Sequence, residues 1–399
     1  MRSICFISAF YPTVISPTSH VFVRNLVWGL ADQGVECSVI SPVAINLNYK
    51  YASLPKVTEE RTPSGSVVKL YFPRFISFGQ RKLAGFKTTH LTTQLFHNAV
   101  RKQFREFEEK PEVVYGHFIT PAGITAARIG REFGIPAFAA YGESTPWSIN
   151  NYGLNSVVKE LETLSGIVSV SSNNKDTLKN LGILNEDKIA VFPNAIDSSR
   201  YYPRDKAEAR KKFGFPQDAF IVAFVGQFSE RKGVLRVAEA LDGLEGVSVI
   251  YAGKGEQTPN NSNILHCGLV KPEEIPVFLS TADAFLLPTL NEGCCNAIVE
   301  AMACGLPVIS SNLPFNFDIL SKDTACLIDP SNVAEIRQAV LKLKEDQHLR
   351  ANNRAASLAR ASMLSQKNRA NNIWNWIKAM SENSNSRKGD KLFESASTR

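Results

Sequence analysis

Short apolar runs alternate with segments of helical spacing along most of this chain. Residues 4–10 form the first run, and residues 21–33 carry apolar side chains three and four positions apart. An unbroken apolar run is typical of a strand buried on both faces, as in parallel sheets. Parallel strands need crossover connections, usually helices, so the alternation predicts an α/β fold. Expected strands are 4–10, 35–40, 113–115, 137–140, 167–170, 220–225, 247–251, 264–266, 284–287 and 307–310; expected helices are 21–33, 121–133, 156–164, 174–181, 234–241, 272–280 and 296–303.

The alternation breaks once, after Val191. Turn residues Pro193 and Asn194 and a charged stretch over 204–212 precede its restart at Phe220. The 399 residues also exceed one ordinary core, since domains run to roughly 100–200 residues. We therefore expect two α/β domains with a cleft between them. The expected parts are a first domain over 1–193, a linker over 194–218, a second domain over 219–365, a helix over 366–380 that crosses back, and a polar, disordered tail over 381–399.

Composition excludes several classes of protein. No stretch approaches the ~20 apolar residues that span a bilayer. The seven cysteines are odd in number and form no C-x-x-C pair, which argues against a disulfide framework or zinc ribbon and favours a reducing cytoplasm. No Asp-x-Asp occurs, so no metal site is signalled. The first strand lacks a following G-x-G-x-x-G, which makes a nicotinamide oxidoreductase the poorest fit.

The net charge of +7 is concentrated in one segment. Residues 61–105 contain nine basic and no acidic residues, with phenylalanines interleaved. Basic and aromatic side chains suit an anionic membrane surface, where each nearby cation contributes ~1 kcal/mol. A solvated face over ordinary core phenylalanines is the alternative. No nucleic-acid-binding motif accompanies the segment, so we expect no nucleic-acid partner.

The most informative segment is Thr289–Ile309, with the sequence TLNEGCCNAIVEAMACGLPVI. It reads as a strand end, a loop with Glu292 and Gly293, a helix bearing Glu300, and a turn into the next strand. The helix start near Asn296 offers unpaired N–H groups and a positive dipole end. Glu300 lies about one turn in, where its carboxylate can accept hydrogen bonds from ligand hydroxyls.

This segment resembles the Glu-x7-Glu motif of the retaining glycosyltransferases of family 4, which have the GT-B fold of two Rossmann-like, doubly wound domains facing a central cleft. Other blocks resemble that family in the same order. They are 117–123 (HFITPAG), 192–197 (FPNAID), 225–233 (VGQFSERKG), 252–256 (AGKGE), 266–270 (HCGLV) and 282–288 (ADAFLLP). The resemblance covers nearly the whole chain and is strongest over 220–330.

The resemblance implies a transferase that takes its sugar from a nucleoside-diphosphate sugar, and family frequency favours the uridine diphosphate form. Arg231 and Lys232 would stabilise the charge that grows on the diphosphate. Glu292 would bind the donor sugar, Glu300 the ribose, and the departing phosphate would help deprotonate the acceptor. The remaining donor-binding residues would be Gly226, Gly253, Lys254, Val270, Gly293, Cys294, Cys295 and Asn296. No cofactor or metal is implied.

In the first domain the resemblance implies a catalytic role for His117, which follows a strand. His20 and Glu143 are acceptor-side candidates. Glu143 stands in Gly-Glu-Ser where the family usually has Gly-small-Asp, and the Ser16–His20 loop lacks the family's paired glycines. Cys294 and Cys295 stand where Phe-Gly is common, which leaves the donor sugar open.

The expected acceptor is lipid-linked or a saccharide, in polysaccharide or glycolipid biosynthesis. The expected location is the cytoplasm, peripheral at the inner face of the plasma membrane, with residues 61–105 on anionic lipid. Two alternatives stay open. One is a GT-B sugar-nucleotide epimerase, which would give product without an acceptor. The other is a non-catalytic partner protein, which would bind nucleotide without turnover.

Overall fold

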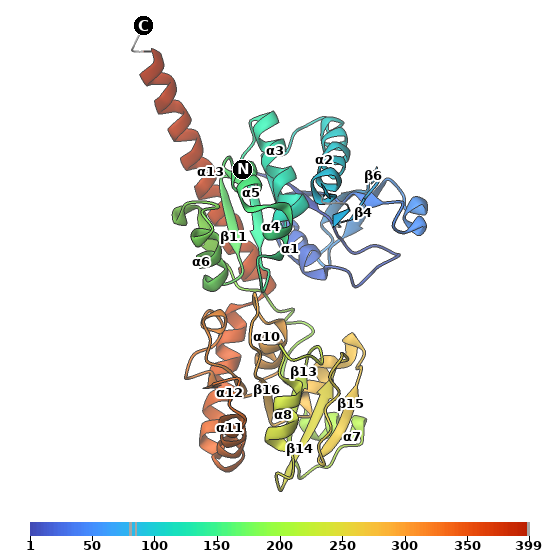
Figure 1. Ribbon diagram of the computed structural model, residues 1–399, viewed down its shortest axis with the longest axis vertical. Coiled ribbons are helices and arrows are strands. Elements are labelled where there is room, and N and C mark those ends of the chain that lie inside the picture. The colour runs from blue at the N-terminus through green and yellow to red at the C-terminus, as the bar shows by residue number, and fades with distance from the viewer. Residues whose placement is uncertain (80–81, 84–85, 397–399) are drawn as a thin grey trace. The chain divides into compact units, whose positions relative to one another are not determined.

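The computed structural model describes residues 1–79, 82, 83 and 86–396. The chain forms two compact units, one of Met1–Phe192 with the residues from Lys367 onward, the other of Pro193–Gln366 (Figure 1). No helix of the described part is long and apolar enough to cross a membrane.

The first unit is built on an eight-stranded sheet in the order β12-β11-β10-β9-β1-β2-β5-β4. All neighbours pair in parallel except β4 with β5 at one edge. The order reverses beside β1, between β2 and β9, as in doubly wound folds. The strands are β1 (Ser3–Ser8), β2 (Glu36–Ile40), β4 (Val57–Arg61), β5 (Val67–Tyr71), β9 (Val113–His117), β10 (Ala137–Tyr141), β11 (Gly166–Ser169) and β12 (Ile189–Val191).

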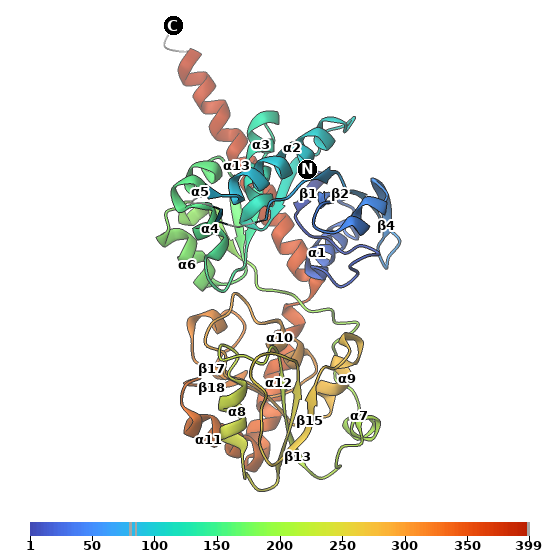
Figure 2. The ribbon, with the colours of Figure 1, turned by 45° about the vertical axis from the view of Figure 1, so that its right-hand side comes forward.

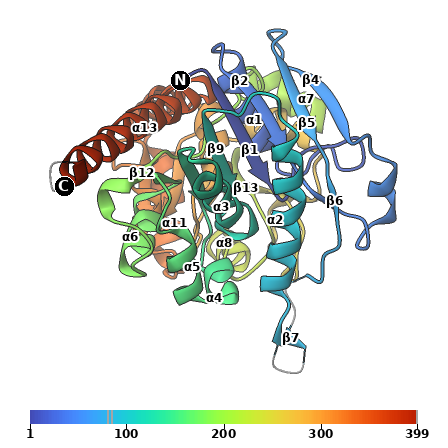
Figure 3. The ribbon, with the colours of Figure 1, turned by 90° about the horizontal axis from the view of Figure 1, so that it is seen from above.

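Strand β1 shows why the apolar runs are continuous. Ile4 and Phe6 pack into the core on one face of the sheet, whereas Cys5 and Ile7 pack into the core on the other. Helices α1 (Val21–Ala31) and α13 (Gln366–Ala396) contribute to the first core. The opposite face carries α2 (Thr89–Arg105), η2 (Ile119–Gly123), α3 (Ile124–Phe133), α4 (Trp147–Tyr152) and α5 (Leu154–Leu161), while α6 (Ser172–Asn180) packs near β11 and β12 (Figure 3).

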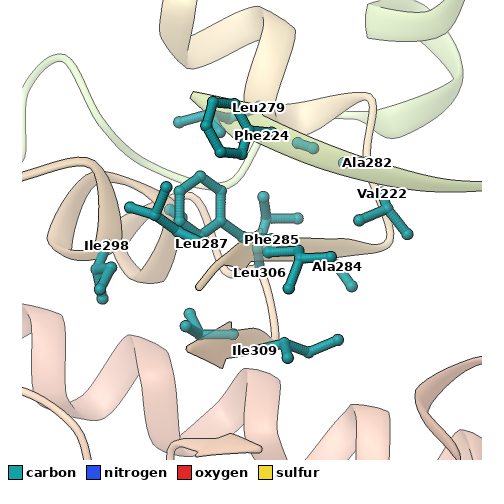
Figure 4. Close-up of a cluster of buried hydrophobic side chains, with 14 of the residues drawn as sticks. Val222, Phe224, Leu279, Ala282, Ala284, Phe285, Leu287, Ile298, Leu306 and Ile309 are labelled. Carbon is teal, nitrogen blue, oxygen red and sulfur yellow. The ribbon is translucent and has the colours of Figure 1, made fainter. Parts of the chain in front are cut away.

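The second unit has a six-stranded parallel sheet in the order β15-β14-β13-β16-β17-β18. This is the strand order of a dinucleotide-binding Rossmann fold. Its strands are β13 (Phe220–Val225), β14 (Val247–Ala252), β15 (Ile264–Gly268), β16 (Ala284–Leu287), β17 (Val308–Ser311) and β18 (Ala325–Ile328). Figure 4 shows Phe285 and Leu287 of β16 packed with Phe224 of β13 and Ile298.

Helices flank both sides of this sheet. Helices α8 (Val234–Leu241) and α11 (Val333–Glu345) pack together on one side. Helices α10 (Asn296–Ala303) and α12 (Gln347–Met363) pack together on the other. Helix α7 (Lys206–Phe213) packs on α9 (Ile275–Ser280) near the β15 edge (Figure 2).

Two boundaries differ from those expected, and several elements were not anticipated. Residues 194–218, expected as a linker, belong to the second unit, because α7 is anchored by the buried ion pair of Arg210 with Asp283. The final helix does not end at residue 380 before a disordered tail but continues to Ala396. Packing of Trp374 and Ile377 holds its first turns, and extending an existing helix costs far less than starting one. The sequence did not predict α2, α4, α11, α12, β18 or the short elements over 43–87. These short elements include β3 (Val43–Ala44), β6 (Arg74–Phe75), β7 (Lys82–Leu83) and β8 (Phe86–Lys87).

Candidate functional site

The candidate donor site lies at the switch point of the second unit. Strands β13 and β16 are neighbours there, and their outgoing loops leave the same edge of the sheet. Ligands of open α/β sheets bind at such an edge, outside the carboxyl ends of the strands. The first loop carries Arg231 and Lys232, and the second carries Glu292.

The structure brings these three charged side chains together. Arg231 Nη1 lies 2.5 Å and Lys232 Nζ 2.6 Å from the same oxygen, Glu292 Oε1. Glu292 and Lys232 are largely buried, whereas Arg231 is more than a third exposed. The cluster has a net charge of +1 and presents two adjacent cations at the sheet edge. An anionic ligand can therefore be held there by charge-assisted hydrogen bonds.

Main-chain and hydroxyl contacts hold the two loops in register. The Leu290 N–H donates to the Arg231 carbonyl at 2.8 Å, and Arg231 Nη1 donates to the Asn291 carbonyl at 2.8 Å. Thr289 Oγ1 donates to Glu292 Oε1 at 3.0 Å. Gly233 ends the first loop with φ +78°, where a Cβ would lie 2.7 Å from the Pro288 carbonyl oxygen. Only glycine fits this conformation and this close approach.

The glycines of the expected Gly-x-Gly loop act in packing. A Cβ on Gly253 would lie 1.9 Å from the Gly226 carbonyl oxygen, and the Phe228 N–H donates to the Lys254 carbonyl at 2.9 Å. These contacts fasten the loop after β14 to the loop after β13. Lys254 itself is exposed, and Val270 is half-buried just beyond β15. Both lie on loops that leave the same edge of the sheet.

The start of α10 forms the other side of the site. Gly293 and Cys295 are buried, Cys294 is half-buried and Asn296 is exposed. Cys295 Sγ lies 3.8 Å from Lys232 Nζ, and burial raises the pKa of this thiol. Asn194 supports the loop, since its side chain donates to Asn296 Oδ1 at 2.8 Å and its N–H donates to Cys294 Sγ at 3.4 Å.

Glu300 lies farther along α10 with a partner that the sequence did not signal. Burial raises the pKa of this carboxyl group, and a hydrogen bond from the Tyr201 hydroxyl and the charge of Arg200 partly oppose that rise. Tyr201 is distant in sequence and belongs to no motif. Tyr201 therefore holds the Glu300 carboxylate at the edge of the site. From sequence spacing alone, Glu300 could be identified only as an acid on a helix.

The switch point of the first unit carries an aromatic cluster around two histidines. His117 ends β9, and His20 stands before α1 with a left-handed φ of 50°. The His20 ring lies 4.7 Å from Phe10 and 5.4 Å from Phe22, and the Phe22 ring lies 5.5 Å from His117. The rings of Phe10 and Phe22 are exposed. This edge is thus an apolar platform with two embedded imidazoles.

Both imidazoles are neutral at physiological pH. Burial, with the charge of Arg369 and the proximity of His20, lowers the pKa of His117 to about 3. Burial also lowers the pKa of His20. His117 Nδ1 is buried and has no hydrogen-bond partner among the described residues. Because buried polar atoms are normally satisfied, this nitrogen is suited to bind a ligand atom.

Glu143 makes no contact with this cluster among the described residues. Its carboxylate accepts a hydrogen bond from the Ser148 N–H at 3.1 Å near the start of α4, and its carbonyl accepts one from Asn174 at 2.7 Å. Burial raises the pKa of the Glu143 carboxyl group. A local structural role explains these contacts.

Part of the basic segment 61–105 is engaged in the core or in ion pairs. Phe72, Phe96 and Phe104 are buried in the core. Arg101 and Arg105 both pair with Glu132. Arg81 and the side chains of Lys82 and Phe86 lie outside the described residues. The alternative of core phenylalanines under a solvated face fits these residues, and membrane contact by the segment stays a prediction.

No group of three histidine, cysteine or acidic side chains placed to hold a metal ion occurs within the described ranges. Independence of metal stays a prediction from the sequence.

Known proteins resemble the chain along both units. Residues 205–360 match the family Glycosyl transferases group 1, and residues 19–200 match Glycosyltransferase Family 4. TuaC of Bacillus subtilis, a glycosyltransferase named for teichuronic acid biosynthesis, is 25% identical over 358 residues, which cover 86% of this chain and 90% of TuaC. The UDP-Gal:alpha-D-GlcNAc-diphosphoundecaprenol alpha-1,3-galactosyltransferase of Escherichia coli is 30% identical over 181 residues, 41% of this chain and 46% of that enzyme.

The fold has close structural neighbours as well. Anabaena HepE, solved in complex with UDP, superposes with a TM-score of 0.70 at 15% identity and covers 95% of this chain and 100% of HepE. At that identity the likeness shows the fold, which is GT-B, as the motif order implied. With the two family matches on its two Rossmann-like units, the chain belongs to the glycosyl transferases of group 1.

Proposed function

We propose that this chain transfers a sugar from a nucleoside-diphosphate sugar, with retention, to a lipid-linked or saccharide acceptor in the building of a surface polysaccharide or glycolipid. The observation that carries the proposal is the convergence of Arg231 and Lys232 on Glu292 at the switch point. A leaving nucleoside diphosphate gains negative charge in the transition state. Two preorganised cations at the sheet edge stabilise that charge without a metal ion.

The two acids of the site, Glu292 and Glu300, then bind hydroxyl groups of the donor. The Glu292 carboxylate accepts hydrogen bonds from the donor sugar, and Glu300, held by Tyr201, accepts from the ribose. A single carboxylate at the sugar argues against the paired-carboxylate chemistry of most hydrolases. Front-face displacement, in which the departing phosphate takes the acceptor proton, is compatible with this set.

The relatives support the choice of donor and acceptor. HepE was solved with UDP, and the Escherichia coli relative is named for a UDP-galactose donor and a diphosphoundecaprenol acceptor. By the same likeness we propose a UDP-linked donor and an acceptor on a lipid. His117, whose buried Nδ1 has no described partner, would bind the acceptor or the donor sugar. A cytoplasmic location at the membrane surface would bring the enzyme to such an acceptor.

The test is a transfer assay with UDP-sugars and a short-chain lipid diphosphate saccharide, read by UDP release and by the anomeric signal of the product. We expect an α-linked product from an α-linked donor. Lys232→Met should reduce transfer by about 100-fold, because removing one preorganised charge donor costs ~3 kcal/mol of transition-state stabilisation. Lys322→Met, an exposed lysine of the same unit outside the proposed donor site, is the matched control. An inverted product, or equal activity of the two variants, would refute the proposal.

A further inference from the structure

A pocket of about 550 Å³ lies on the face of the first unit that carries α2, α3, α4 and α5. Its walls are residues of α2, α3, α4 and α5, which pack against one another on this face (Figure 3). None of its residues belongs to the donor site or to the histidine cluster. We propose that this pocket binds the phosphodiester headgroup of an anionic phospholipid and so docks the enzyme on the membrane.

The pocket is cationic once its internal ion pair is counted. Arg128, Arg131, Lys159 and Glu160 line it. Glu160 is engaged by Arg128, which bonds both of its carboxylate oxygens. Arg131 approaches Glu160 only to 3.9 Å and is half exposed, and Lys159 is exposed with no ion pair within the described part of the chain. Two positive charges therefore remain for a ligand.

Neutral groups complete the site. The His90 ring packs on the Tyr152 ring with centroids 4.1 Å apart, so one wall is aromatic. Ser156 adds a hydroxyl. Arginine, lysine and hydroxyl donors around one cavity suit the oxygens of a phosphate group. The volume lies within the range of pockets that hold small molecules, so a headgroup fits.

Exposed apolar side chains on the neighbouring elements favour a lipid over a free phosphate. Leu91, in the pocket wall, is 39% exposed. Trp147, which begins α4, is 59% exposed, and Phe78, whose N–H bonds Thr92 of α2, is 48% exposed. Tryptophan and phenylalanine beside cations are typical of surfaces that rest in the headgroup layer. A soluble anion would gain nothing from them.

The pocket also has a functional place within its unit. Helix α4 follows the carboxyl end of β10, and the histidine cluster lies at the carboxyl ends of the neighbouring β9 and β1. A membrane held at α2 and α4 would therefore lie near the edge where an acceptor is expected. This last step rests on the proposed function, whereas lipid binding itself does not.

The experiment is co-sedimentation of the full chain with phosphatidylcholine vesicles, with and without phosphatidylglycerol, in the absence of donor and acceptor. The pocket variant is Arg131→Gln with Lys159→Gln. The matched control is Lys50→Gln with Lys56→Gln, two exposed lysines elsewhere in the same unit. We expect binding only to the anionic vesicles. The pocket variant should lose at least about tenfold in partitioning, since each cation near an anionic surface contributes ~1 kcal/mol, while the control changes little.

Three outcomes would overturn the inference: no preference for anionic vesicles, equal losses in both variants, or retention of binding by a folded pocket variant. Trp147→Ser gives a second check and should weaken vesicle binding without changing net charge. Protection of the pocket in hydrogen exchange by inorganic phosphate, with none by vesicles, would identify a soluble anion instead. Transfer to a water-soluble acceptor in detergent should be the same in the pocket variant and the wild type, so a failure of the transferase proposal is distinguishable.

Discussion

The ion-paired triangle at the donor site makes an unusual prediction for Glu292→Gln: the nucleotide should bind more tightly while transfer fails. In the free enzyme the Glu292 carboxylate neutralises one of two cations and lies beside the place where a diphosphate would bind. The amide keeps the shape and loses the charge. Arg231 and Lys232 then meet the diphosphate with no competing anion.

The magnitude follows from the geometry. Two unit charges ~6 Å apart interact by about 3 kcal/mol at an effective dielectric constant of ~20. Arg231 is more than a third exposed, so solvent screens part of this repulsion and about 1–2 kcal/mol remains, or roughly 5- to 30-fold in Kd for UDP. Transfer should fall by roughly 10- to 100-fold, because a hydrogen bond to a charged group contributes about 1.5–3 kcal/mol.

Calorimetric titration with UDP and the transfer assay measure the two effects separately. Glu256→Gln is the matched control, since Glu256 is an exposed acid on the loop after β14. The control should match the wild type in both assays. Weaker UDP binding by Glu292→Gln would mean that the carboxylate serves mainly to position the cations, and the reasoning from charge would be wrong.

Three further predictions concern stability. Asp283→Asn should destabilise the second unit by about 3–5 kcal/mol in urea unfolding, because it leaves the buried Arg210 guanidinium unpaired, whereas Lys206→Met, which removes an exposed partner of the same acid, should cost less than about 1 kcal/mol. The lowered pKa of His117 means that the folded state resists its protonation; stability is fully present above pH ~6.5 and falls progressively below it, and His117→Phe should flatten this slope in melting temperatures measured from pH 7.5 down to pH 5. Gly253→Ala should weaken both folding and UDP binding, because its Cβ would lie 1.9 Å from a main-chain carbonyl oxygen, and unchanged melting would contradict that packing role.

The core of the second unit could be predicted from the sequence almost to the residue. Strands β13 and β16 and helices α8 and α10 begin and end where the pattern placed them. Strands buried on both faces must be apolar throughout, so their runs are unambiguous. The short elements over 43–87 were not predicted because β4 and β5 alternate in burial and β3 and β6 have two residues each. Elements this short contain too few residues for a periodic pattern to be recognised.

The candidate site likewise combines residues that could be identified from their motifs with contacts that only the folded structure shows. Motif order located Arg231, Lys232 and Glu292, because their loops leave adjacent strands. Sequence could not show that Tyr201 bonds Glu300, since that contact joins segments about a hundred positions apart.

The basic segment illustrates the converse. Nothing in the sequence indicates that Arg101 and Arg105 are paired, because their partner Glu132 lies 31 and 27 positions farther along the chain. Two cations that stay available to a ligand, Arg131 and Lys159, lie outside the segment, and the pocket that they share forms only when α3 and α5 pack together. Which cations are free to bind a partner therefore depends on the fold. A search of such chains for membrane contacts should first set aside the lysines and arginines that form ion pairs.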